Sequence, residues 1–267
     1  MSTALVTGGT SGIGAEFARA LADRGYDLVL VARDVERLEE TAARLSAKGV
    51  SVEVLAADLS SRADVDRVAA RVADETSPID LLVNNAGFSV HTKLLDPDVS
   101  RHDLAFEVMM RAVLVLSGAA GRAMRDRGSG AILNVSSTAG FVTMGSYSAL
   151  KAWVTAYTEG LANELHGSGV TVTALCPGWV HTEFHERGGI NTSSIPGPMW
   201  STVDVTVAAA LRDLDRGAVI SIPTVRYRAL IWFVRHIPKS AVRAISRAIS
   251  STRSRTNQQH GGSERSA

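Results

Sequence analysis

The 267-residue sequence has little of what builds disulfide-rich or fibrous proteins. Its one cysteine, Cys176, rules out an intrachain disulfide and a cysteine-based metal cage. Aromatic residues make up only 5% of the chain, but the 45% hydrophobic and 21% charged fractions exclude collagen-like, mucin-like and wholly disordered classes. No uninterrupted apolar run approaches the roughly 18 residues that would span a bilayer. Residues 1–20 also lack the layout of a signal peptide, so the sequence predicts a cytoplasmic protein.

Charge is small in total and uneven along the chain. The net charge is +1, yet residues 226–267 carry nine Lys and Arg residues and one acidic residue, a local charge of +8. The preceding residues carry 19 basic and 26 acidic side chains, a charge of −7. Such asymmetry is typical of a tail that has its own partner or meets an anionic surface.

Strand-like and helix-like segments alternate. Short aliphatic and β-branched runs predict strands at 4–7, 27–32, 51–57, 81–84, 131–136, 170–176 and 218–222. Apolar residues at three- and four-residue spacing predict helices at 13–24, 35–48, 62–75, 101–127, 146–165 and 203–214. Continuous apolar strands suit a parallel sheet that is covered on both faces. We therefore expect an α/β fold, a doubly wound, Rossmann-like parallel sheet of about seven strands in a single domain.

Two regions depart from this alternation. Residues 182–201 hold three glycines and two prolines without clear periodicity, which indicates a long loop, and long loops in compact folds are often functional. Residues 226–250 place apolar side chains at helical spacing between arginines, and residues 251–267 are small, polar and expected to be disordered. The amphipathic basic extension suits packing on the loop or on a neighbouring subunit, which we favour. It also suits peripheral contact with anionic lipid, whereas the acidic body argues against nucleic acid.

The first predicted strand runs into a glycine-rich turn, Thr7-Gly8-Gly9-Thr10-Ser11-Gly12-Ile13-Gly14, and a helix follows. Glycines let the backbone turn sharply and approach a pyrophosphate closely. The helix amino end then offers free N–H groups and a positive dipole to the phosphates. A dinucleotide-binding turn is therefore expected, although glycine-rich turns also occur for geometry alone.

Three further motifs stand in a fixed order after this TGxxxGxG turn. They are Val83-Asn84-Asn85-Ala86-Gly87, Tyr147-Ser148-Ala149-Leu150-Lys151 and Pro177-Gly178-Trp179-Val180-His181-Thr182. Together with the turn they resemble the short-chain dehydrogenase/reductase family, including its ketoacyl reductases and hydroxysteroid dehydrogenases, over about residues 1–222. The resemblance implies a nicotinamide cofactor, a dinucleotide-binding and catalytic domain at 1–225, and a substrate loop at 182–201. The cofactor would be held by the residues Gly8, Thr10, Ser11, Gly12, Ile13, Gly14, Asp58, Leu59, Asn85, Ala86, Tyr147, Lys151, Val180 and Thr182. For Asp58, a helix cap is the alternative.

The end of the second predicted strand bears on the choice between NAD and NADP. A ribose 2′-hydroxyl is typically held by a carboxylate there, and a 2′-phosphate needs a cation. No carboxylate occupies Ala32, and Arg33 can pair with a phosphate through its planar fork. Asp34 is expected to cap the next helix. The sequence therefore favours NADP, with a solvated surface arginine as the alternative for Arg33.

Tyr147 and Lys151 lie four residues apart, hence on one helix face. A tyrosine has an unperturbed pKa near ~10, and a nearby cation lowers it by favouring the phenolate. We expect Tyr147 to be the acid/base and Lys151 to lower its pKa and clamp the ribose. The resemblance gives Ser137 the role of binding the substrate oxygen, because Thr138-Ala139-Gly140 follows it, with Ser136 as the alternative.

One position departs from the family. The resemblance places Met109 where the family has a catalytic asparagine, and a thioether cannot hold a relay water as an amide does. No metal is expected, since His181 and His185 at i, i+4 spacing have no evident third ligand. The expected function is reduction of a lipophilic ketone or aldehyde, 3-oxoacyl or steroid-like, with NADPH, in a homodimer or homotetramer. An NAD-dependent alcohol dehydrogenase and a catalytically silent NADP-binding sensor or scaffold are the alternatives.

Overall fold

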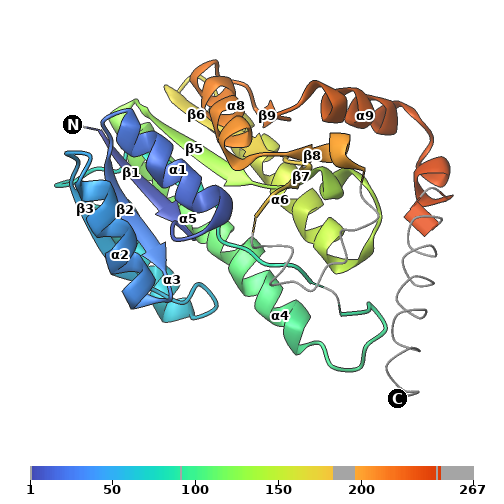
Figure 1. Ribbon diagram of the computed structural model, residues 1–267, viewed down its shortest axis with the longest axis horizontal. Helices are drawn as coiled ribbons and strands as arrows, with labels where there is room; N and C mark the ends of the chain where they lie inside the picture. Colours follow the sequence, from blue (N-terminus) through green and yellow to red (C-terminus); the bar gives the residue numbers. More distant parts are fainter. Residues whose placement is uncertain (1, 91, 183–195, 245, 248–267) are drawn as a thin grey trace.

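The computed structural model describes residues 2–90, 92–182, 196–244 and 246–247. At its centre is a seven-stranded parallel sheet in the order β3-β2-β1-β4-β5-β6-β9 (Figure 1). The strands are β1 (Thr3–Thr7), β2 (Asp27–Ala32), β3 (Val52–Ala56), β4 (Leu81–Asn84), β5 (Gly130–Val135), β6 (Val170–Leu175) and β9 (Ile220–Ser221). Because β1 pairs with both β2 and β4, the strand order reverses at β1. The prediction of a doubly wound sheet is confirmed.

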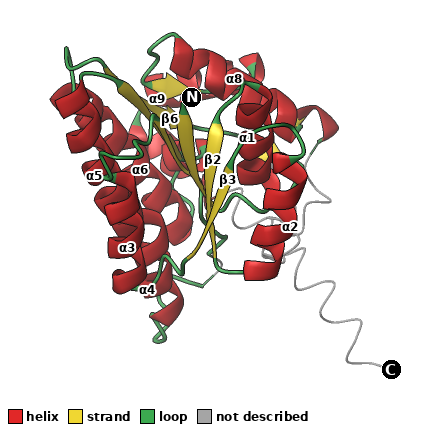
Figure 2. Cartoon of the chain, turned by 90° about the vertical axis from the view of Figure 1, so that its left-hand side faces the viewer, coloured by secondary structure: helices red, strands yellow, loops and turns green. Residues whose placement is uncertain are grey.

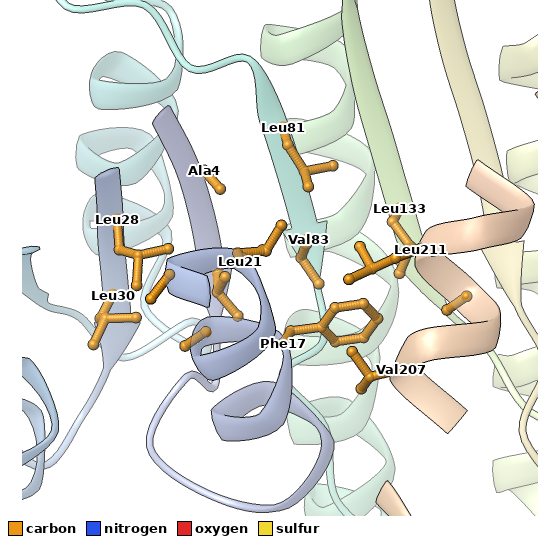
Figure 3. Close-up of a cluster of buried hydrophobic side chains, with 14 of the residues drawn as sticks. Ala4, Phe17, Leu21, Leu28, Leu30, Leu81, Val83, Leu133, Val207 and Leu211 are labelled. Carbon is orange, nitrogen blue, oxygen red and sulfur yellow. The ribbon is translucent and has the colours of Figure 1, made fainter. Parts of the chain in front are cut away.

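Helices cover both faces of the sheet (Figure 2). One face carries α1 (Gly12–Asp23), α2 (Val35–Ser46) and α8 (Val203–Asp215). The other carries α3 (Arg62–Val72), α5 (Ala112–Arg127) and α6 (Gly145–Glu164). Successive strand residues point to opposite faces, so Val6 packs among the residues of the first layer and Leu5 among those of the second. Phe17 of α1 lies in the first of these cores beside Val207 of α8 (Figure 3).

The helix predicted at 101–127 is divided. It consists of α4 (Ser100–Phe106), a π-helical turn at Glu107–Arg111, and α5. By length and composition, Ser100–Arg127 is apolar enough to cross a membrane, which the sequence did not lead us to expect. Half of its apolar window is buried inside the protein, and α5 packs on α3, β4 and β5. It is therefore accounted for as a core helix.

The carboxyl-terminal part of the chain packs on the end of the sheet. A two-stranded parallel ribbon joins β7 (Trp179–Val180) to β8 (Trp200–Ser201). Helix α9 (Val225–His236) follows β9 at one end of the molecule (Figure 1) and contacts the 3-10 turn Thr138–Phe141. Helix α9 is the first part of the predicted basic extension, and the packing of that extension on the substrate loop or on a neighbouring subunit stays a prediction. Most of the predicted substrate loop, at 183–195, and the predicted disordered tail, at 251–267, lie outside the described residues.

Candidate active site

The predicted site residues gather at one edge of the sheet. Strands β1, β4, β5 and β6 end at Thr7, Asn84, Val135 and Leu175. The glycine turn, the Asn85 motif, the two candidate serines and the Pro177 motif lie within a few residues of these ends, and Tyr147 and Lys151 lie on α6, the helix that follows β5. Parallel strands present their carboxyl ends at the same edge, where the reversal of strand order opens a crevice. The motifs, which are up to about 170 positions apart in the sequence, are therefore brought together.

The glycine turn after β1 is held by side chains from two strand ends. Gly8 has φ +66°, a left-handed conformation, and a Cβ on Gly14 would overlap the Gly8 carbonyl oxygen. The Asn85 amide Nδ2 donates to the Thr7 carbonyl at 3.0 Å and to the Gly8 carbonyl at 3.3 Å. In return, Thr7 Oγ1 accepts from the Asn85 and Ala86 backbone N–H groups at 2.9 and 3.1 Å. The sequence analysis did not include Thr7 among the candidate site residues, although Thr7 begins the glycine motif.

The amino end of α1 is suited to binding an anion. Ser11 is the N-cap residue with an extended backbone and makes no side-chain capping bond. The first-turn N–H groups of a helix have no intrahelical acceptors, and the first turn of α1 contains no acidic residue. A Cβ on Gly12 would lie 3.4 Å from the Thr182 side chain, so this turn adjoins the loop that follows β7. These features fit a pyrophosphate group.

Three of the residues predicted to contact the cofactor, Arg33, Asp58 and Leu59, follow the ends of β2 and β3. Arg33 is exposed, while Asp34 caps α2 by accepting from the Arg37 backbone N–H at 3.1 Å. Asp58 accepts from the Ser60 backbone N–H at 3.0 Å and from its hydroxyl at 2.8 Å. The N-cap of α3 is Ser61, so the alternative that made Asp58 the helix cap is wrong. The predicted contacts Leu59 and Val180 are both buried.

The two candidate serines point to different partners. The buried Ser136 hydroxyl donates to the Lys151 carbonyl at 2.7 Å and lies 2.8 Å from Thr155 Oγ1, so it fastens β5 to α6. The Ser137 hydroxyl accepts instead from the Ala139 backbone N–H at 3.1 Å and interacts with the Tyr147 phenol, whose pKa it lowers. The geometry therefore favours Ser137 as the residue beside the acid/base.

The electrostatics of Tyr147 differ from the expectation. Burial raises the pKa of the Tyr147 phenol to about 12, opposed only by the Ser137 hydrogen bond. Lys151 does not lower it, because its Nζ lies 5.7 Å from the phenol ring centre and donates to the Val135 carbonyl at 2.8 Å. Burial also lowers the pKa of Lys151 to about 8. In the protein alone, desolvation thus outweighs the predicted effect of the lysine on the phenol.

Met109 lies on the π-helical turn and is fully buried. A Cβ on Gly87 would lie 3.1 Å from the Met109 sulfur and 3.8 Å from Lys151 Nζ. Met109 and Lys151 therefore flank the same backbone position after β4. A π-helical turn inserts one residue into a helix and is frequent at functional sites.

Tyr227 of α9 is a residue of the site region that sequence reasoning missed. Its hydroxyl accepts from the Trp179 backbone N–H at 3.1 Å and donates to the Met199 carbonyl at 3.0 Å. It thus joins β7 to the turn before β8, at both ends of the predicted substrate loop.

His181 stacks on Trp200 at 4.3 Å between ring centres, and His185 lies outside the described residues. Within the described ranges, no group of three His, Cys, Asp or Glu could hold a metal ion.

Comparisons with known proteins agree with this arrangement. The family model for short chain dehydrogenase matches residues 2–190. A Streptomyces virginiae protein assigned as a ketoacyl reductase of the monensin polyketide synthase is 39% identical over 194 residues, 69% of this chain and 72% of the relative.

Solved structures extend the likeness to nearly the whole fold. A short-chain dehydrogenase from Sphingobium yanoikuyae in complex with NADPH is 36% identical, with a TM-score of 0.80 over 90% of this chain and 97% of the other. The bulky-bulky ketone specific alcohol dehydrogenase from Comamonas testosteroni is 31% identical, with a TM-score of 0.76 over 90% and 96%. Since sheet order, motif placement and sequence similarity agree, the protein belongs to the short-chain dehydrogenase/reductase family of oxidoreductases.

Proposed function

We propose that this protein is an NADP-dependent reductase that converts a lipophilic ketone or aldehyde, of 3-oxoacyl or steroid-like character, into an alcohol. The observation that carries the proposal is the placement of three side chains together: the Ser137 hydroxyl interacts with the Tyr147 phenol and lowers its pKa, and the buried Lys151 Nζ lies 5.7 Å from the phenol ring centre. A protein that only binds a cofactor does not need the Tyr147 phenol and the Ser137 hydroxyl next to each other and near the buried Lys151 amine. We place the enzyme in the cytoplasm as a homodimer or homotetramer.

The residues that we propose to bind the cofactor suit the chemical groups of a dinucleotide. The turn from Gly8 to Gly14 would hold the pyrophosphate, Arg33 the 2′-phosphate, and Val180 with Thr182 the carboxamide. When bound, the cofactor supplies the hydride that reduces the carbonyl carbon. NADP is favoured over NAD because Arg33 is exposed at the end of β2 and the nearest carboxylate, Asp34, is engaged in capping α2. The related structure in complex with NADPH supports this choice.

Proton transfer falls to the chain itself. A carbonyl that gains a hydride becomes an alkoxide unless an acid donates to its oxygen. Tyr147 is protonated at neutral pH, because its pKa lies far above 7, and donates its phenolic proton to that oxygen. Ser137 hydrogen-bonds the same oxygen and holds it against the phenol. Lys151, whose Nζ donates to the Val135 carbonyl at 2.8 Å, is the residue that we propose to hold the ribose of the cofactor.

Apolar side chains around the site favour a lipophilic substrate. Phe141 and Met144 follow Ser137, and Met199 with Trp200 comes from the β8 side, all partly buried. Phe184 of the predicted loop lies outside the described residues. Relatives named for ketoacyl reduction and for bulky ketones support the same substrate class.

The test compares the wild type with two tyrosine variants on one helix. Purified protein is mixed with NADPH or NADH and a panel of 3-oxoacyl thioesters, steroid ketones and medium-chain ketones. Tyr147→Phe is expected to lower kcat by at least about a hundredfold. The matched control Tyr157→Phe, whose partly exposed phenol contacts the Leu114 carbonyl at 3.3 Å, should leave kcat within about twofold. Undiminished alcohol formation by Tyr147→Phe would overturn the mechanism, and tighter binding of NADH than NADPH would contradict the role of Arg33.

A redox-silent NADP-binding sensor is the second candidate, favoured by Met109 in place of the family asparagine. It predicts that the protein binds NADPH but turns over no carbonyl of the panel. Cofactor binding measured by fluorescence, together with the same panel, separates it from the reductase.

A further inference from the structure

Helix α9 is apolar on two opposite sides. At 100° per residue, Tyr227 and Ile231 fall on one side, and both are buried against the rest of the chain. On the outward side stand Val225, Trp232 and Phe233, which are 71%, 63% and 53% exposed. Burial on the protein therefore accounts for one apolar side only, and the outward side leaves two large aromatic rings in water.

Basic residues flank this outward side. Arg226 lies on one flank, and Arg228 and Arg235 lie on the other, all exposed. Residues 225–247 contain six Lys and Arg residues and no acidic residue. An apolar strip with aromatic rings between rows of cations matches the interface of a bilayer that contains anionic lipid. A second copy of the same face is a poorer occupant, because like charges would oppose each other across it.

We propose that the outward side of α9, formed by Val225, Trp232 and Phe233 with its flanking arginines, docks this protein on an anionic lipid surface. The position of the helix gives the docking a consequence. Helix α9 packs on the turn Thr138–Phe141 that directly follows Ser137, and Arg235 lies 5.9 Å above the Phe141 ring. Tyr227 of the same helix joins β7 to the turn before β8. A docked molecule therefore holds the turn after Ser137 and the β7–β8 ribbon close to the bilayer, and the use of this position for a lipophilic substrate rests on the proposed reduction of a lipophilic carbonyl.

The test is co-sedimentation of the full chain with vesicles. We expect binding to vesicles of equimolar phosphatidylcholine and phosphatidylglycerol, weaker binding to phosphatidylcholine alone, and a loss of binding as salt is raised. The double variant Trp232→Ser/Phe233→Ser should lower the partition coefficient by about tenfold or more. A matched control, Val54→Ser/Val205→Ser, removes two exposed apolar side chains from β3 and α8 and should bind like the wild type.

Three outcomes would overturn the proposal. They are the absence of binding to the anionic vesicles, equal binding by the double variant, and dissociation of an oligomer by that variant without lipid, which would assign the strip to a second copy. Thermal unfolding checks that all variants are folded. Turnover of a water-dissolved ketone should be the same in the wild type and the double variant, since neither aromatic ring belongs to the catalytic site. A wild type that binds vesicles but reduces no ketone would remove the reductase proposal and leave the docking standing.

Discussion

Ser136 and Ser137 show how neighbouring residues of the same type acquire different roles. The chain is extended at Ser137, with φ −168° and ψ 153°, so consecutive side chains point to opposite sides. One hydroxyl is buried against α6 and the other faces Tyr147. The sequence motif limited the choice to two positions, and only the direction of the side chains distinguishes them.

Met109 is the residue that most directly limits the proposed chemistry. We predict that Met109→Asn leaves the Kd for NADPH unchanged and preserves or raises kcat, because an amide beside Lys151 can hold water that a thioether cannot. Steady-state kinetics and a cofactor titration check this. Loss of activity in a folded variant would show that Met109 does not occupy the relay position.

The burial of Lys151 should make the free energy of unfolding depend on pH. Burial lowers its folded-state pKa to about 8, whereas an unfolded lysine titrates near ~10.4. Between these values the unfolded chain binds more protons, so this residue makes the free energy of unfolding rise with pH, by roughly 3 kcal/mol across the window. Urea unfolding at about pH 8 and about pH 10 should show this rise in the wild type relative to Lys151→Met. The comparison cancels the opposite contributions of Tyr147 and Cys176, whose pKa values are raised by burial. The same pH dependence in both proteins would contradict the prediction.

At the scale of elements, a chain of buried polar side chains ties the helix of the site to the sheet. The Asn84 amide donates to Ser117 and Asn134, each at 2.9 Å, and the Asn134 amide donates to Thr158 at 3.0 Å. These residues come from β4, α5, β5 and α6 in turn. Because these buried polar groups are partnered in this register, the network fixes the position of α6 along the sheet, and with it Tyr147 and Lys151, the proposed catalytic pair.

The junction between β6 and β7 depends on the absence of a side chain. A Cβ on Gly178 would overlap the ring of Tyr227, which links α9 to both β7 and the turn before β8. We predict that Gly178→Ala displaces α9 and destabilises the protein by about 1–3 kcal/mol. Gly160→Ala, in α6 with no heavy atom within 4 Å of the new Cβ, should stabilise it by about 1 kcal/mol. Thermal unfolding of the two variants measures the difference in stability. Unchanged stability of Gly178→Ala would contradict the role of Tyr227 in joining α9 to β7 and to the turn before β8.

At the scale of the whole molecule, part of the surface suits self-association. Leu114 on α5 is 48% exposed, and the nearby Trp153 and Tyr157 rings on α6 stack at 4.9 Å between ring centres. We predict a homodimer or homotetramer that Leu114→Arg converts to smaller species, because a buried unpaired charge is unfavourable in an interface. Sedimentation velocity measures this, with Val205→Arg on exposed α8 as the control. An unchanged assembly in Leu114→Arg would place the interface elsewhere.

The sequence by itself determined the fold class, the alternation of the sheet strands with helices, and the glycine turn that follows the first strand. These depend on local signals: apolar periodicity, glycines where a side chain would clash, and motifs at strand ends. The sequence also predicted that Asp34 caps α2. Asp34 does so by accepting a hydrogen bond from the backbone N–H of Arg37, three residues further along the chain. The tertiary structure decided three features: which serine lies beside Tyr147, that burial of the phenol outweighs the expected effect of Lys151 on its pKa, and that Tyr227 joins β7 to the turn before β8. Those features arise from contacts between residues distant in the chain and from desolvation, and neither is encoded in the spacing of neighbouring residues.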